Sequence, residues 1–361
     1  MTSGALAWLV AQGVQNTYTT GTMDSSLFRQ RFSRCSNFSQ SPSQLGIVGK
    51  IAPGSRSVIS IPKKGDLINY LWIDTASAHS ALQGTVFELW VGSQMIDSQT
   101  VDYVTDIWQV YLAETKSKSS GINNFVSTSD TSFFPFHFYF CDNSQFFPLI
   151  SVPFAEVEIR VRWGPSVSAD PKVYGNFIYL DTAEREYFAS GEQRDFMITQ
   201  VQKLEFNNPD GDMNLDLSSL NHPVKALFWG QETKSDEMED DYFTFDGARI
   251  MLNGQDLLSY MDASYFHTVQ AYYHTTNAII NFVNALKCPF YTRYYMYSYA
   301  MDASAMSSTG SCNFSRLDNA TLQLKNAQRP PARQSDTLNV YALSWNVLRF
   351  QSGLAGILFS N

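Results

Sequence analysis

The stretch Glu156-Val157-Glu158-Ile159-Arg160-Val161-Arg162-Trp163 alternates polar and apolar side chains over its whole length. Successive side chains of a β-strand point to opposite faces, so this period of two predicts a strand with one buried and one solvated face. Further short strands are expected at residues 57–61, 87–91 and 249–252. Turn signals separate such strands: Gly164-Pro165, Asn208-Pro209-Asp210-Gly211 and Asn253-Gly254. These patterns indicate a chain that is mostly β-structure.

Helical patterns are few. Residues 101–114 carry apolar side chains at helical spacing and predict one helix. Asp181 or Thr182 is a suitable N-cap with Glu184 or Arg185 in the first turn, which predicts a second, short helix ending near Ser190.

Three blocks of the chain recur in the same order in its second half. Residues 66–73 resemble 222–229 at an offset of 156, and residues 88–94 resemble 249–255 at an offset of 161. Residues 159–161 and then 176–180 resemble 322–324 and then 339–343, both at an offset of 163. Their common order indicates an internal duplication.

Two consecutive β-units of roughly 150 residues each would suit the length of an eight-stranded jelly roll. We therefore expect an all-β fold of two tandem eight-stranded antiparallel jelly rolls with few short helices. The expected division is an N-terminal arm at 1–40, a first jelly roll at 41–190 and a second at 191–361.

Composition narrows the function. The 361-residue chain is 44% hydrophobic and 16% charged, so it can bury a substantial core. Its 26 Phe and 19 Tyr suit half-buried sheet surfaces better than helix faces. Its net charge is −9 and it has no dense basic stretch, so we expect no direct binding of nucleic acid, which requires a basic patch.

The apolar residues 4–11 could be mistaken for a signal peptide. No Lys or Arg precedes Arg29, so the charged region of a signal peptide is missing. No stretch approaches the roughly 20 apolar residues of a membrane span, and we expect a soluble, non-secreted protein without a transmembrane segment. The cysteines are too far apart for a CxxC site and are expected to be free, mostly buried thiols: Cys35, Cys141, Cys288 and Cys312.

No constellation of an enzyme is found. The chain has neither a G-x-S-x-G elbow nor a P-loop. Its five histidines form no metal motif: His79, His137, His222, His267 and His274. We therefore expect no enzyme, with no catalytic, cofactor-binding or metal-binding residue and no cofactor.

Three weaker motifs have a structural interpretation. Residues 210–216 place oxygens at alternate positions like a calcium loop, but Gly stands second and Asn221 stands twelfth, so a solvated hairpin turn is preferred. The acidic run 236–241 is expected to be a solvated loop. Three N-x-S/T sequons are interpreted as structural: Asn37, Asn313 and Asn319.

A family resemblance runs from residue 4 to the C-terminus. Its most specific parts are Tyr179-Leu180-Asp181-Thr182-Ala183-Glu184-Arg185 and Asn313-Phe314-Ser315-Arg316-Leu317-Asp318-Asn319. With residues 4–21, 222–229, 252–256 and 341–356, these resemble the double jelly-roll major capsid proteins of nucleocytoplasmic large DNA viruses. Ala183 and Ala226 depart from the acidic residues common in that family, and the loops are short, which leaves little outer decoration.

The resemblance implies a structural protein of the virion capsid. It implies a homotrimer whose six jelly rolls form a pseudo-hexameric capsomer that tiles an icosahedral shell, assembled in the host cell cytoplasm. The partners would be copies of the same chain, minor capsid proteins and penton proteins. The arm 1–40 would lie on the inner side of the shell and order on assembly, although a frayed terminus is the simpler interpretation.

Two other functions stay open at this point. Jelly rolls also serve as carbohydrate- or ligand-binding modules, and the Trp and Tyr side chains could stack on sugars. A cupin-like enzyme would need clustered His and Glu ligands, which the sequence does not place together.

Overall fold

The computed structural model describes residues 3–10, 13–18, 35–76, 82–115, 118, 131–141, 145–167, 171–207, 209–231, 243–276, 294–328 and 337–360. The chain forms two compact units, residues 1–37 and 38–361. The smaller unit contains helix α1 (Ser3–Val10) and the 3₁₀ helix η1 (Val14–Tyr18). Leu6, Val14 and Tyr18 are exposed there.

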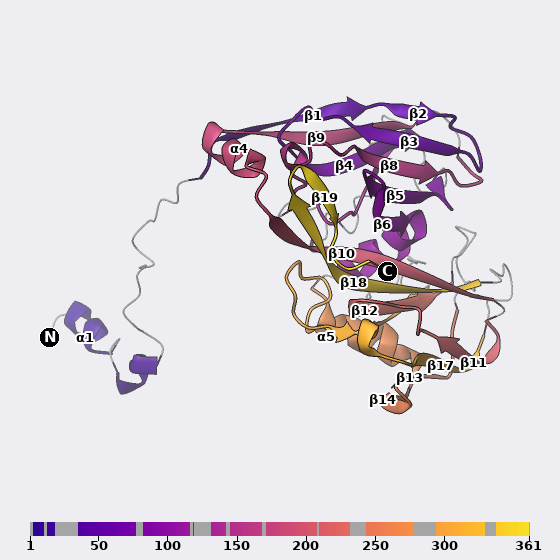
Figure 1. The fold of residues 1–361 in the computed structure, drawn as a ribbon. Helices are drawn as coiled ribbons and strands as arrows, with labels where there is room; N and C mark the ends of the chain where they lie inside the picture. Colours follow the sequence, from indigo (N-terminus) through magenta and orange to yellow (C-terminus); the bar gives the residue numbers. More distant parts are fainter. Residues whose placement is uncertain are drawn as a thin grey trace. The chain divides into compact units, whose positions relative to one another are not determined.

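The first jelly roll pairs two antiparallel sheets (Figure 1). One has the order β1-β9-β4-β7: β1 (Phe38–Leu45), β9 (Lys172–Leu180), β4 (Leu67–Ala76) and β7 (Thr131–Pro135). The other has the order β2-β3-β8-β5-β6: β2 (Ile47–Gly49), β3 (Arg56–Ile61), β8 (Val157–Arg162), β5 (Val86–Val91) and β6 (Gln94–Thr100). In β8 the apolar side chains of Val157, Ile159 and Val161 are buried, as the alternation predicts.

The second jelly roll repeats this arrangement. One sheet has the order β10-β18-β12-β15: β10 (Arg194–Asn207), β18 (Thr337–Gln351), β12 (Pro223–Gly230) and β15 (Tyr294–Ser298). Two short strands extend it, since β16 (Cys312–Asn313) pairs with β12 and β19 (Leu354–Ile357) pairs with β18. The other sheet has the order β11-β17-β13-β14: β11 (Gly211–Asp216), β17 (Ala320–Ala327), β13 (Gly247–Leu252) and β14 (Gln255–Met261).

Eight strands of the first jelly roll correspond to eight strands of the second, and β2, β16 and β19 are additional. The order β1-β9-β4-β7 matches β10-β18-β12-β15, and β3-β8-β5-β6 matches β11-β17-β13-β14. The repeated sequence blocks fall on corresponding strands, β4 with β12, β5 with β13, β8 with β17 and β9 with β18. The prediction of two tandem eight-stranded jelly rolls is confirmed.

The helices lie mostly in connections. The predicted helix at 181–190 is α4 (Thr182–Ala189), and the Asp181 carboxylate accepts a hydrogen bond from the Thr182 N–H. Shorter 3₁₀ turns are η3 (Leu149–Ser151) and η6 (Phe314–Arg316). In the second jelly roll, η4 (Tyr265–Val269) and α5 (Gln270–His274) follow β14. No helix among the described residues is long and apolar enough to cross a membrane.

The helix predicted at 101–114 is of a different type. Residues Tyr103–Leu112 form a π-helix, η2, in which Ala113 N–H reaches the Trp108 carbonyl. Every residue of η2 except Trp108 is buried. The helical spacing of apolar residues predicts only one buried face. It could not predict the nearly complete burial of η2, which lies between the two jelly rolls.

Two apolar cores hold the larger unit together. One fills the interior of the second jelly roll, with Leu227, Trp229 and Val340 among its members. The other fills the first jelly roll and continues onto Phe228 and Tyr341 of the second. The sheet of β12 and β18 is therefore buried on both faces, as its burial patterns show.

Candidate functional site

Histidines and cysteines make separate local contacts. The His137 ring stacks on Trp108 with centroids 3.4 Å apart, and burial lowers the His137 pKa to about 3. His79 and Cys288 lie outside the described residues. Three free cysteines are exposed or half-buried, so the expectation of mostly buried thiols is wrong for them: Cys35, Cys141 and Cys312. Among the described residues, no group of three or more His, Cys, Asp and Glu side chains is placed to hold a metal ion.

Residues 211–216 form strand β11 rather than a hairpin turn, because their backbone pairs with β17. Two of the acidic side chains bind protein N–H groups. The Asp212 carboxylate accepts from the Asn326 N–H at 2.9 Å, and the Asp216 carboxylate accepts from the Ser218 N–H at 2.9 Å. The acidic run 236–241 lies outside the described residues.

The family block at 179–185 holds α4 against the first jelly roll through Asp66. The Asp66 carboxylate is nearly inaccessible and accepts hydrogen bonds from the Leu180 N–H and the Arg185 Nε, both at 2.8 Å. The Asp66 backbone also donates to the Ile178 carbonyl and accepts from the Ile150 N–H. Through its carboxylate and its backbone, Asp66 thus ties together three segments that are distant in sequence. Sequence reasoning did not single out Asp66, because one aspartate before a strand has no distinguishing pattern.

The family block at 313–319 joins two loops of the second jelly roll. At one end, Ser315 Oγ accepts from the His222 N–H at 2.8 Å, and the Phe314 N–H donates to the His222 carbonyl at 3.0 Å. These bonds hold His222 in the left-handed region at a φ of 69°. The Asn313 side chain accepts from the Ser315 N–H at 3.1 Å. The side chains of the sequon at Asn313 therefore take part in the loop structure.

At the other end of this block the partner is the turn after β13. The Asn253 side-chain oxygen accepts from the N–H groups of Asp318 and Asn319, at 3.0 and 3.2 Å. The Asn253 N–H in turn donates to the Asn319 carbonyl at 2.7 Å. Asn253 and Gly254 both have positive φ, as a tight hairpin turn requires. The block at 313–319 therefore fixes the geometry of two loops.

The two jelly rolls meet at an extensive contact that we call the junction. It comprises the contacts of β6 and η2 with β10, β12, β15, β18 and β19. Aromatic rings form its centre. Tyr103 packs on Tyr341 with centroids 5.7 Å apart, Tyr111 packs on Phe228 at 5.7 Å, and the Tyr111 hydroxyl donates to the Tyr294 carbonyl at 2.6 Å. Since these side chains are buried, the junction resembles a domain core more than a transient contact.

Polar groups at the junction are paired across it. The Asp97 carboxylate of β6 accepts from the Val201 N–H of β10 at 2.9 Å, and Gln200 Nε2 donates to the Ile96 carbonyl. Gln99 Nε2 also donates to Asp97 at 2.8 Å. Burial raises the pKa of the Asp97 carboxyl to about 6, although the hydrogen bonds from Val201 and Gln99 favour its ionised form. Asp97 was not predicted from the sequence, which has no pattern marking an interdomain carboxylate.

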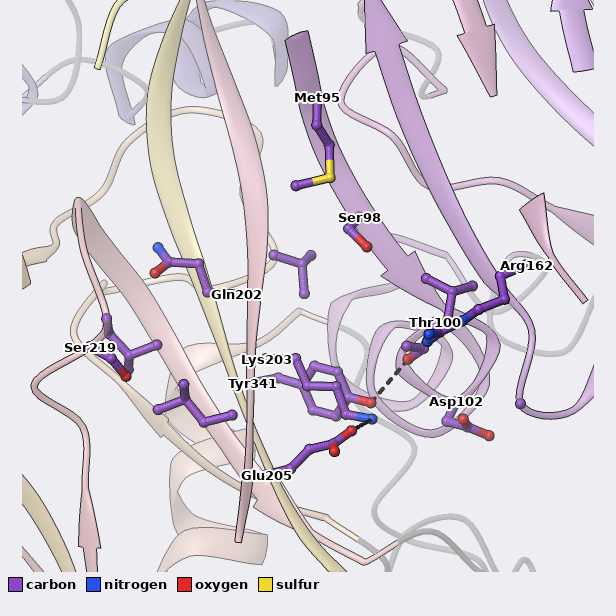
Figure 2. A pocket seen from close by; sticks show the side chains of 15 residues that line it. Met95, Ser98, Thr100, Asp102, Arg162, Gln202, Lys203, Glu205, Ser219 and Tyr341 are labelled. Atoms are coloured by element: carbon purple, nitrogen blue, oxygen red, sulfur yellow. Dashed lines mark hydrogen bonds and ion pairs between the residues drawn. The ribbon is translucent and has the colours of Figure 1, made fainter. Parts of the chain in front are cut away.

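A cleft of about 580 Å³ opens along one side of the junction (Figure 2). Its lining includes Met95, Ser98 and Thr100 from β6 and Gln202, Lys203 and Glu205 from β10. The Thr100 and Tyr341 hydroxyls lie 3.0 Å apart, and Lys203 Nζ lies 2.9 Å from Glu205 Oε1. The Thr100–Tyr341 contact joins the two jelly rolls, whereas the Lys203–Glu205 ion pair lies within β10.

Two family models cover most of the chain. Residues 26–181 match the N-terminus of the major capsid protein, and residues 184–356 match the large eukaryotic DNA virus major capsid protein. The boundary between them falls at α4, between the two jelly rolls.

Curated relatives and solved structures agree with these matches. The chain is 28% identical to the major capsid protein of Pyramimonas orientalis virus and 26% identical to that of Paramecium bursaria Chlorella virus 1, in each case over 99% of this chain and 100% of the relative. In fold, it matches a chain of the PBCV-1 virus capsid with a TM-score of 0.77, at 23% identity over 93% of this chain and 100% of that one.

The Faustovirus major capsid protein matches with a TM-score of 0.69, at 8% identity over 94% of both chains. These relatives are structural capsid proteins, not enzymes. The tandem jelly rolls, the two family blocks and the full-length relatives lead to one assignment. The chain belongs to the double jelly-roll major capsid proteins of nucleocytoplasmic large DNA viruses, which are structural proteins of the virion capsid.

Proposed function

We propose that this chain is the subunit of a homotrimeric, pseudo-hexameric capsomer that tiles an icosahedral shell. The observation that carries the proposal is the buried junction, through which two jelly rolls of the same topology share one core within a single compact unit. Three such bodies would place six similar jelly rolls around one axis. Closed rings of this kind give every subunit the same environment, and obligate interfaces in them bury thousands of Å².

The proposal divides the chain into the arm 1–40, the first jelly roll 41–190 and the second 191–361. The arm would contact neighbouring capsomers and minor capsid proteins on the inner side of the shell, and penton proteins would be further partners of the capsomer. Exposed Leu6, Val14 and Tyr18 support a segment that gains partners on assembly. The proposal includes assembly in the host cytoplasm and a subunit without a catalytic, cofactor or metal site.

Light scattering on the purified full-length chain tests the oligomeric state. The expected mass is three times that of the 40.7 kDa chain. A chain that stays monomeric at high concentration contradicts the capsomer. Electron micrographs of particles should show pseudo-hexagonal units with two towers per subunit.

A further inference from the structure

Because the two jelly rolls have the same topology, each can carry counterparts of both surfaces that meet at the junction. Contacts between chains can therefore be inferred from the junction within one chain. Within the chain, η2 follows β6 of the first jelly roll and packs on the outer face of the sheet β10-β18-β12-β15. Its Tyr111 contacts Phe228 and the Tyr294 carbonyl, and its Tyr103 contacts Tyr341. The junction thus has two halves, a helical segment of one jelly roll and a sheet face of the other.

The second jelly roll carries a helical segment in the corresponding place. The segment η4–α5 follows β14 as η2 follows β6, and it too begins with π-helical turns. Tyr272 lies 161 positions after Tyr111, which is the offset that relates β5 to β13, and Tyr273 is the next residue. Tyr111 is fully buried, whereas Tyr272 and Tyr273 are 72% and 71% exposed. Two adjacent tyrosines exposed to this degree lack the cover that their counterpart has.

The first jelly roll carries the corresponding sheet face. Trp72 of β4 is paired with Tyr174 of β9, just as Phe228 of β12 is paired with Tyr341 of β18. Trp72 stacks on Tyr174 with centroids 5.2 Å apart and lies 5.9 Å from Tyr70. In the neighbouring strand, Phe133 is 44% exposed, while Tyr294 at the matching register is fully buried.

This face points away from the second jelly roll. The sheet that contains β5 and β6 lies between the sheet β1-β9-β4-β7 and the strands β10 and β18 (Figure 1). The aromatic face, which we define as Tyr70, Trp72, Phe133 and Tyr174, therefore cannot be covered by η4–α5 of the same chain. A second copy can supply that segment.

We propose that η4–α5 of one copy packs on the aromatic face of the next copy, repeating between chains the junction found within the chain. The inference rests on the proposed homotrimer and names its interface. The contact is heterologous, since the two surfaces differ, and such contacts form closed rings when the rotation between copies closes. Tyr272 and Tyr273 act as aromatic anchors, the residue type that dominates such interfaces.

Two double variants test the interface in the full-length chain. The segment variant is Tyr272→Ser with Tyr273→Ser, and the face variant is Trp72→Ser with Phe133→Ser. Each should raise the dissociation constant of the trimer by at least about 30-fold, since loss of aromatic anchors costs that much or more. The control is Phe154→Ser with Tyr187→Ser, which removes two exposed aromatic rings outside both surfaces and should leave the trimer intact.

Thermal unfolding checks that each variant folds. If the face variant does not fold because Trp72 is half-buried, Phe133→Lys alone replaces it, since that side chain is more exposed. The segment variant alters only exposed side chains and tests the proposal independently.

Mixing the two variants tests the pairing itself. The segment variant keeps the aromatic face, and the face variant keeps η4–α5, so each variant alone should be monomeric. In the mixture, η4–α5 of the face variant can pack on the aromatic face of the segment variant. The expected product is a one-to-one heterodimer that cannot close into a ring. Trimers of both variants as stable as the control would overturn the interface while leaving the homotrimer standing. Monomers that stay monomeric on mixing would overturn the head-to-tail pairing.

Two further outcomes would contradict the capsomer itself or assign the aromatic face to sugar binding. A wild-type chain that is itself monomeric contradicts the proposed capsomer, not only its interface. Wild-type trimers that bind oligosaccharides on an array, with binding lost in a face variant that remains trimeric, would assign the aromatic face to sugar stacking instead.

Discussion

At the scale of single residues, Asp66 and Arg185 form one ion pair but should contribute very differently. The Asp66 side chain is 4% exposed and satisfies the Leu180 N–H, while the Arg185 side chain is 58% exposed. Asp66→Ala leaves a buried N–H without its acceptor and should lower the free energy of unfolding by about 2 to 3 kcal/mol. Arg185→Ala should cost less than about 1 kcal/mol, as exposed ion pairs do. Thermal unfolding of both variants measures the difference, and equal losses would contradict this account.

Asp97 should make stability depend on pH. Its pKa is raised from 3.8 to about 6 in the folded chain, so the folded state binds a proton more tightly than the unfolded state does. Stability should therefore fall as pH rises from 4 to above 6. Asp97→Asn should remove this fall and stabilise the chain at pH 7 by at most about 3 kcal/mol, less whatever the altered contact with Gln99 costs. Denaturant unfolding between pH 4 and 8 measures it.

Asp195 is the matched control for that experiment. Its exposed carboxylate pairs with Arg349 at 2.8 Å, and the hydrogen bond from Arg349 lowers its pKa. A lowered pKa contributes stability that is lost as pH falls, which is the opposite sign. Asp195→Asn should therefore leave the loss of stability above pH 4 in place. If Asp195→Asn abolishes the loss of stability above pH 4, Asp97 is not the source of that loss.

The sequence was only partly informative at this scale. The blocks 179–185 and 313–319 could be found through their resemblance to a family, and the structure gives each a physical role. Asp66 and Asp97 could not, because a carboxylate beside an alternating strand pattern looks like any solvated residue. Their burial comes from segments more than 100 positions away, namely Leu180 and Val201.

At the scale of elements, the β13–β14 hairpin depends on Asn253 in two separable ways. Asn253 adopts a φ of 50°, and its side chain accepts two N–H groups from the 313–319 block. Asn253→Gly keeps the turn and loses the side-chain bonds, which should cost about 1 kcal/mol. Asn253→Ala adds left-handed strain and should cost about 1 to 2 kcal/mol more. Thermal unfolding should rank wild type above Gly and Gly above Ala, and a reversed order of the two variants would contradict the strain.

Strands were easier to predict than helices. The alternation of polar and apolar residues in β8 predicts a strand with one buried face, and β8 has that burial pattern. By contrast β12 and β18 are buried on both faces, so their sequences hardly alternate, and only the repeat identified them. The type of η2 could not be predicted, since its burial depends on the second jelly roll.

At the scale of the whole molecule, the arm and the jelly rolls should be separable in function. Residues 1–37 form a compact unit distinct from 38–361. Deleting residues 1–21 should leave the proposed trimer folded and impair shell assembly. Light scattering measures the trimer, and electron microscopy counts closed shells beside the full-length chain. Loss of the trimer on deletion would show that the arm belongs to the subunit interface.

The tandem architecture could be predicted because a drifting offset preserves the order of strands even when few residues are identical. The junction could not be predicted, since no sequence block marks which face of a jelly roll meets the other. Phe228 and Tyr341 look like ordinary core residues of the second jelly roll, yet they belong to the core of the first.

The buried junction also changes how a ring of jelly rolls can be built. A ring of separate single jelly rolls would need a collision between molecules for every joint. In the proposed trimer half of the joints would lie within single chains, where β9 and β10 are separated only by α4 and short flanking residues. Short tethers give effective concentrations in the millimolar range, so these joints form whatever the concentration of free subunits. Dilution would then weaken only the joints between chains, so the concentration at which closed rings form would depend on the affinity of those joints.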